Sequence, residues 1–146
     1  MSIAIALDFG LQAAGILMIG LAISHVYISK LLNWQEDVKK LTPINAQVFW
    51  AHTLFLAWGL MLLGFCCLFF PSALTNRSTL GALASVCFAM CWLVRLVFQF
   101  TFFVAKFHEN EVLHTALRVL STCLWIYFTA LFSILFAYQC GVIKEL

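Results

Sequence analysis

Four long apolar segments restrict what this sequence can fold into. They run from about Phe9 to Ile28, Ala46 to Phe70, Leu80 to Ala105 and Val112 to Tyr138. Each reaches the length of about 20 residues that an α-helix needs to cross about 30 Å of hydrocarbon. None shows the alternating pattern of a membrane β-strand. The sequence therefore predicts an all-α integral membrane protein, a single domain with four transmembrane helices in an up-down bundle.

The composition supports lipid rather than water as the main solvent of the chain. Of the 146 residues, 64% are hydrophobic and 10% are charged, whereas a soluble domain carries about 25% charged residues. The net charge of +2, with no basic run, argues against a nucleic-acid partner. The six cysteines lie in or beside apolar segments, which indicates buried thiols rather than a disulfide framework. The expected partners are the bilayer, a hydrophobic small molecule, and further copies or subunits of a membrane complex.

The segment between the first two spans has an amphipathic pattern. Apolar residues recur there at helical spacing, at Leu31, Trp34, Val38 and Leu41. This pattern predicts a short helix lying on the membrane surface. Thr42 and Pro43 then suit the N-cap and first turn of the second span. Trp34, Trp50 and Trp125 are expected to anchor at the membrane interfaces.

Basic residues near the span ends predict the orientation. Lys30, Lys39, Lys40, Lys106 and Arg118 fall on one face, and only Arg77 and Lys144 fall on the other. Because basic residues favour the cytoplasmic side, the first face is predicted to be cytoplasmic. Both termini are then non-cytoplasmic, in an inner or plasma membrane.

All four histidines are predicted to lie near the cytoplasmic face, one from each span. They are joined by Glu111, which shares a helix face with the histidine three residues later. Imidazole and carboxylate groups are suitable ligands for iron, manganese or zinc. The predicted metal ligands are His25, His52, His108, His114 and Glu111.

Two known site types use similar residues. The spacing Glu111-x-x-His114 is half of the paired motif of di-iron carboxylate bundles, and the other half is absent. Haem b is an alternative cofactor, which two histidines from different helices would ligate axially. His25 and His52 are the best pair for that role, because they are predicted to lie deepest.

Two arginines in apolar segments are also predicted to be functional. Arg95 lies near the middle of the third span with Gln99 one turn further, and Arg118 lies one turn beyond His114. A charge at the bilayer centre costs about 2.5–3.5 kcal/mol on insertion scales. For Arg95 the alternatives are a ligand anion such as a carboxylate, phosphate or haem propionate, backbone carbonyls, or a subunit interface. We expect Arg95 and Gln99 to bind a ligand or cofactor, and Glu111, Arg95 and Arg118 to be catalytic.

These residues together predict a small metal-dependent membrane enzyme with a His/Glu site near the cytoplasmic face. Its substrate would be lipidic, an isoprenoid, a quinone or an acyl chain, and the reaction an oxidoreduction, hydrolysis or isomerisation. One alternative is a haem-b electron-transfer protein. The other is a non-catalytic subunit or transporter, whose histidines and arginines make interhelical hydrogen bonds or carry protons.

Overall fold

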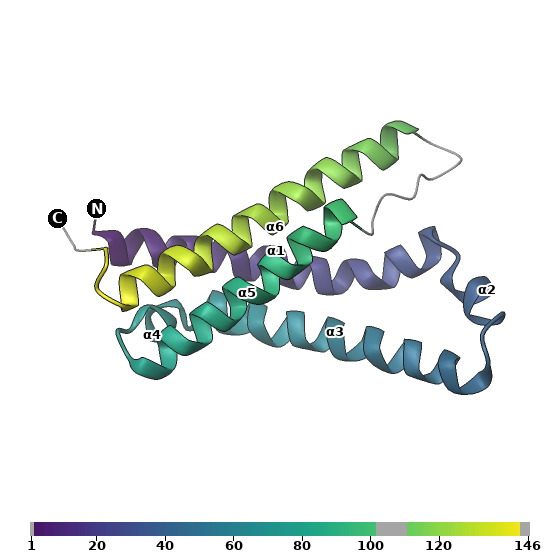
Figure 1. Ribbon diagram of the computed structural model, residues 1–146, viewed down its shortest axis with the longest axis horizontal. Helices are drawn as coiled ribbons and strands as arrows, with labels where there is room; N and C mark the ends of the chain where they lie inside the picture. The colour runs from purple at the N-terminus through teal and green to yellow at the C-terminus, as the bar shows by residue number, and fades with distance from the viewer. Residues whose placement is uncertain (1, 102–110, 144–146) are drawn as a thin grey trace. The chain divides into compact units, whose positions relative to one another are not determined.

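The structure is a computed structural model that describes residues 2–101 and 111–143, with the side chains of residues 111–114 left out of the description. The described chain is helical, and four of its helices are long and apolar enough to cross a membrane (Figure 1). This confirms the predicted all-α class and the four candidate spans. The helices are α1 (Ile3–Leu31), α2 (Trp34–Val38), α3 (Pro43–Phe69), α4 (Pro71–Thr75), α5 (Thr79–Thr101) and α6 (Glu111–Gln139).

Some helix boundaries differ from those predicted. Helix α1 begins at Ile3 instead of Phe9, because residues 3–7 are themselves apolar and continue the helix through Asp8. Pro71 follows the end of α3 and is the first residue of the short helix α4. Proline suits a first helical turn, where its missing N–H would have had no partner in the helix. The predicted end of the third span at Ala105 lies outside the described residues.

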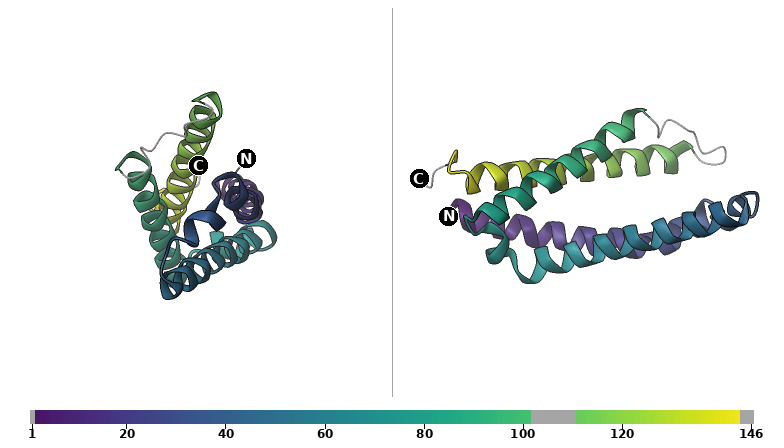
Figure 2. Two further views of the ribbon diagram at one scale, coloured as in Figure 1. Left: turned by 90° about the vertical axis from the view of Figure 1, so that its right-hand side faces the viewer. Right: turned by 60° about the horizontal axis from the view of Figure 1, so that its bottom comes forward.

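The chain divides into two compact units. One is Asp8–Leu74, and the other joins Met1–Leu7 to Thr75–Leu146. In the first unit α1 and α3 run antiparallel with α2 between their ends, and in the second α5 and α6 run antiparallel (Figure 1; Figure 2). The arrangement of all four long helices as one up-down bundle stays a prediction.

Helices α1 and α3 approach each other closely at a pair of glycines. A Cβ atom on Gly15 would lie 2.7 Å from the backbone oxygen of Gly64 and 2.7 Å from the backbone nitrogen of Leu68. A Cβ atom on Gly64 would lie 2.8 Å from Cγ1 of Ile19. Small residues let helix backbones approach in a lipid environment, where packing rather than the hydrophobic effect holds helices together. The first unit therefore depends on the absence of a side chain at both positions.

The connection between α1 and α3 contains the short helix predicted there. Asn33 has a left-handed backbone (φ 50°) that separates α1 from α2, a conformation that asparagine tolerates. Trp34 packs edge-on against Phe49, with ring centroids 5.3 Å apart. Thr42 is the N-cap of α3 and Pro43 its first residue, as predicted, although the Thr42 side chain makes no capping hydrogen bond. Whether α2 lies on a membrane surface stays a prediction.

The charged side chains of this connection pair with each other. Lys39 bonds Glu36 and Lys40 bonds Asp37, each at 2.7 Å. The hydrogen bond from Lys40 to Asp37 raises the pKa of the lysine. Because all four side chains are exposed, these pairs contribute little to stability.

Helices α5 and α6 pack along one continuous seam. The two helices run antiparallel, and their contact positions are spaced alternately four and three apart. The contacts pair Phe88 with Phe132, Trp92 with Phe128, Arg95 with Trp125 and Gln99 with Ser121. This spacing is the heptad pattern of packed helices. Aromatic side chains fill the middle of the seam: Phe88 meets Phe132 with ring centroids 5.4 Å apart, and Trp92 meets Phe128 at 4.6 Å.

Capping interactions stabilise the end of this helix pair where α5 begins and α6 ends. Ser78 caps α5, because its Oγ accepts the Gly81 N–H at 3.0 Å. Helix α6 ends in a Schellman turn, with Gly141 at φ +72° and the Val142 N–H bonded to the Ala137 carbonyl at 3.0 Å. The guanidinium of Arg77 lies 4.3 Å from the centroid of the Tyr138 ring. These contacts fix the chain entering α5 to the chain leaving α6.

Candidate functional site

The polar part of the α5–α6 seam is organised around Gln99. Its Oε1 accepts a hydrogen bond from Nη1 of Arg95 at 3.2 Å and another from Nε1 of Trp125 at 3.3 Å. Its Nε2 donates to Oγ of Ser121 at 3.1 Å. Gln99 is only 4% exposed. The buried amide therefore joins both helices and holds the orientation of the Arg95 side chain.

A second contact fixes the guanidinium of Arg95. Its central carbon lies 4.6 Å from the centroid of a Trp125 ring, which is the geometry of a cation–π interaction. Trp125 in turn stacks on Trp92, with ring centroids 5.5 Å apart and planes 13° from parallel. Arg95 itself is half-buried. The cation is thus held between an amide and an aromatic ring, and it belongs to a residue that is only half-buried.

The structure places Trp125 differently from the sequence analysis. It was expected to anchor at a membrane interface, but it is 6% exposed and lies within the helix pair beneath Arg95. Ser121 and Trp125 were not predicted to be site residues. The signal that identifies them is the alternating three- and four-residue spacing of Ser121, Trp125 and Phe128, which matches that of Trp92, Arg95 and Gln99.

Arg118 lies on α6 three residues before Ser121, on the helix face that also carries Ser121 and Trp125. It is exposed, and its backbone oxygen accepts hydrogen bonds from Ser121 Oγ at 3.0 Å and Thr122 Oγ1 at 2.7 Å. Two helical turns separate it from Trp125, which is roughly 10 Å along the axis. Its predicted catalytic role stays a prediction.

His25 and His52, in the other unit, share one hydrogen-bonding arrangement. Nδ1 of His25 lies 2.8 Å from the Leu21 carbonyl oxygen, and Nδ1 of His52 lies 2.8 Å from the Val48 carbonyl oxygen. A carbonyl oxygen only accepts, so Nδ1 must carry the proton in both rings. In the neutral ring Nε2 then keeps its lone pair. Both imidazoles are therefore in the tautomer that ligates a metal or accepts a proton through Nε2.

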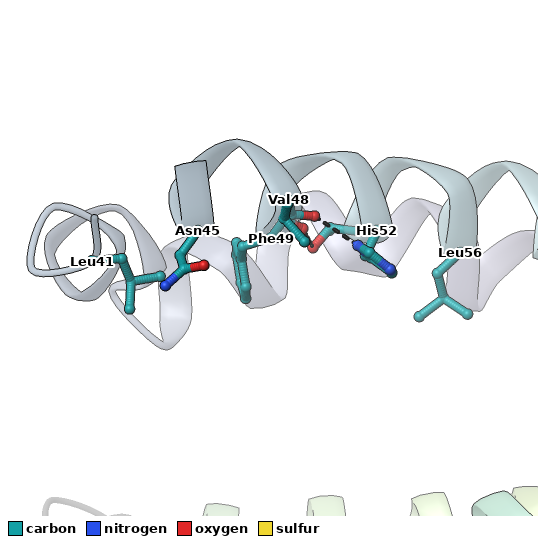
Figure 3. Close-up of a pocket in the computed structure, with 7 residues that line it drawn as sticks. Leu41, Asn45, Val48, Phe49, His52 and Leu56 are labelled. Atoms are coloured by element: carbon teal, nitrogen blue, oxygen red, sulfur yellow. Dashed lines mark hydrogen bonds between the residues drawn. The ribbon is translucent and has the colours of Figure 1, made fainter. Parts of the chain in front are cut away.

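His52 also lies in an open groove on one face of α3 (Figure 3). The groove has a volume of about 490 Å³, and its walls are mainly apolar. The side chain of Asn45 lies towards the α2 end, and Leu56 lies on the far side of the imidazole (Figure 3). The lining residues are Leu41, Asn45, Val48, Phe49, His52, Thr53 and Leu56.

The complete metal-ligand set predicted from the sequence is not shown. His108 lies outside the described residues, and Glu111 and His114 belong to α6 at positions whose side chains are not described. Within the described part of the chain, no group of three or more His, Cys, Asp or Glu side chains is placed to hold a metal ion. The shared site of His25, His52 and the other ligands stays a prediction.

Comparison with known proteins does not assign this chain to a family. No family model, curated protein or solved structure matches it.

Proposed function

We propose that this chain is a small membrane-embedded, metal-dependent enzyme that acts on a lipidic substrate. The observation that carries the proposal is the shared tautomer of His25 and His52. Histidine ligands of metals usually donate their other ring N–H to a carbonyl or carboxylate, which fixes the ring and raises its basicity. The Nδ1 bonds of both histidines fit that role, with Nε2 left for the metal.

The groove around His52 supports a lipidic substrate. Its apolar walls suit a hydrocarbon chain such as an isoprenoid, a quinone tail or an acyl group, and Asn45 supplies a polar group beside them. His25 and His52 would hold the metal together with His108, His114 and Glu111. A bound metal would supply Lewis-acid chemistry, an activated water or oxygen activation. Arg95, Arg118 and Glu111 are the proposed catalytic residues of such an enzyme.

Metal content is the first test of this function. We expect detergent-purified protein to carry about one or two equivalents of iron, manganese or zinc by mass spectrometry. His52→Ala and His114→Ala should each lower that content about tenfold or more, because each removes a ligand. Gln47→Ala, an exposed polar change on α3, is the matched control and should leave the metal unchanged. Unchanged metal in both histidine variants would contradict the shared site.

Haem b is the second candidate, favoured by the same observation. Axial ligation also uses Nε2, and His25 and His52 both present it from helices of the same unit. An absorption spectrum of the purified protein separates the two proposals, because only haem gives a Soret band. A sample with neither metal nor Soret band would instead favour a complex subunit or a transporter whose histidines carry protons.

The proposed site lies at the cytoplasmic face, with both termini on the other side. In a background in which all six cysteines are replaced by alanine, Ser2→Cys should react with an impermeant maleimide added to intact cells. Lys39→Cys, in the exposed connection after α2, should react only after permeabilisation. The reverse pattern would invert the orientation that the basic residues predict.

A further inference from the structure

We propose that Arg95 is the centre of an anion-binding site that takes the carboxylate or phosphate head of a lipidic amphiphile. The site lies on the α5–α6 pair, and none of the proposed metal ligands is part of it. Arginine is well suited to such a head, because its planar guanidinium matches the two oxygens of a carboxylate or phosphate.

Arg95 is held in place before any ligand arrives. The Gln99 amide and the Trp125 ring contact it from α5 and from α6 respectively. Ordering a long cationic side chain on binding costs affinity, and a side chain already ordered avoids that loss. Gln99 has both of its polar atoms engaged within the protein. We therefore assign Gln99 as the positioning residue of the site and Arg95 as the residue that contacts the anion.

The surroundings of Arg95 indicate that the anion is attached to a hydrocarbon chain. Val94 is 50% exposed and Phe98 is 42% exposed, so the half-buried Arg95 has exposed apolar neighbours on α5. Helix α5 is one of the four helices able to cross a membrane. In such a low-dielectric setting the attraction between a cation and an anion is stronger than in water. A free anion would have to leave water to reach the site, whereas an amphiphile already lies in the bilayer.

Binding of oleate tests the site directly. The protein is placed in nanodiscs of phosphatidylcholine, and equilibrium binding is measured for oleate, methyl oleate and oleyl phosphate. We expect oleate and oleyl phosphate to bind at least about tenfold more tightly than methyl oleate, since only the charged heads form charge-assisted hydrogen bonds with the guanidinium. Acetate and inorganic phosphate should bind far more weakly than the amphiphiles. Tight binding of inorganic phosphate would instead make this a site for a free anion and overturn the lipidic ligand.

Variants of Arg95 and Gln99 separate a ligand site from a structural contact. Arg95→Leu should remove the preference for oleate over methyl oleate. In the native protein the amide oxygen of Gln99 lies 3.2 Å from Nη1 of Arg95, and Gln99→Glu places a carboxylate oxygen there. Because this carboxylate would form an ion pair with the guanidinium, it should weaken oleate binding about tenfold or more. The matched control is Gln139→Glu, because Gln139 is also a buried glutamine of the seam but lies at its other end.

The outcomes are distinct from those of the metal test. Arg95→Leu and Gln99→Glu should leave the metal content and the absorption spectrum of the protein unchanged. If Arg95→Leu fails to fold, Gln99→Glu still decides the question, because it retains the cation and replaces the neutral amide beside it with a carboxylate. Wild-type oleate affinity in Gln99→Glu, or equal binding of oleate and methyl oleate by the native protein, would overturn the anion site.

Discussion

Replacing Gly15 by alanine is expected to separate α1 from α3. The new methyl group would lie 2.7 Å from two backbone atoms of α3, and neither can move aside as a side chain would. Overpacking of a tight contact costs about 1–3 kcal/mol, and the upper end applies where backbone must shift. The alanine also gains about 1 kcal/mol of helix propensity over glycine. A net loss of stability therefore reflects the α1–α3 contact and not the helix itself.

Cys67 provides the measurement. It is completely buried and lies three residues from Gly64 on α3, so its thiol should react only when the packing around it opens. With the other five cysteines replaced by alanine, we expect Gly15→Ala to accelerate maleimide labelling of Cys67 roughly tenfold or more. Gly20→Ala is the matched control, because it makes the same change on the same helix with nothing within 4 Å. Equal labelling rates in the two variants would show that the close approach does not hold the unit together.

This pair of glycines shows a limit of what the sequence predicts. The four spans follow from continuous apolar runs of about 20 residues, because a helix of that length satisfies its backbone across hydrocarbon and a membrane strand would alternate. The start of α3 follows from Thr42 and Pro43, since proline fits the first turn and few other places in a helix. Gly15 and Gly20 are equivalent in the sequence, since both lie inside one apolar segment. Only the position of α3 distinguishes them.

The candidate sites were predictable to different degrees. Arg95 and Gln99 were identified because a charge in an apolar segment is costly, and one helical turn separates them. Their partners were missed, because Ser121 and Trp125 are ordinary residues of a span until the register of α5 against α6 is known. The tautomers of His25 and His52 could not be predicted from the sequence either, because they depend on the position of a backbone carbonyl oxygen relative to each ring. The sequence thus predicts which polar groups cost free energy to bury, and the packing of the helices determines which hydrogen-bond partners they find.

Replacing Phe128 by alanine is expected to loosen the α5–α6 pair more than any other single truncation in its aromatic seam. Phe128 is completely buried and packs against Trp92 at 4.6 Å and Trp125 at 6.3 Å, between ring centroids. In water a buried Phe→Ala change costs about 3–5 kcal/mol, part of which is the transfer of the ring from water. In lipid that part is small, so the loss is mainly packing, and we expect about 2–3 kcal/mol.

The effect should also reach the polar cluster, because Trp125 lies between Phe128 and the Arg95 guanidinium. Reversible unfolding in mixed micelles would measure the stability loss, and the preference for oleate over methyl oleate would measure the effect on Arg95. Phe100→Ala is the matched control, since it makes the same truncation on α5 at a ring that is 58% exposed. A stable Phe128→Ala protein that keeps its oleate preference would show that the seam neither holds the helix pair together nor supports the site. A destabilised protein with weakened oleate binding would instead show that the aromatic packing positions Arg95 through Trp125.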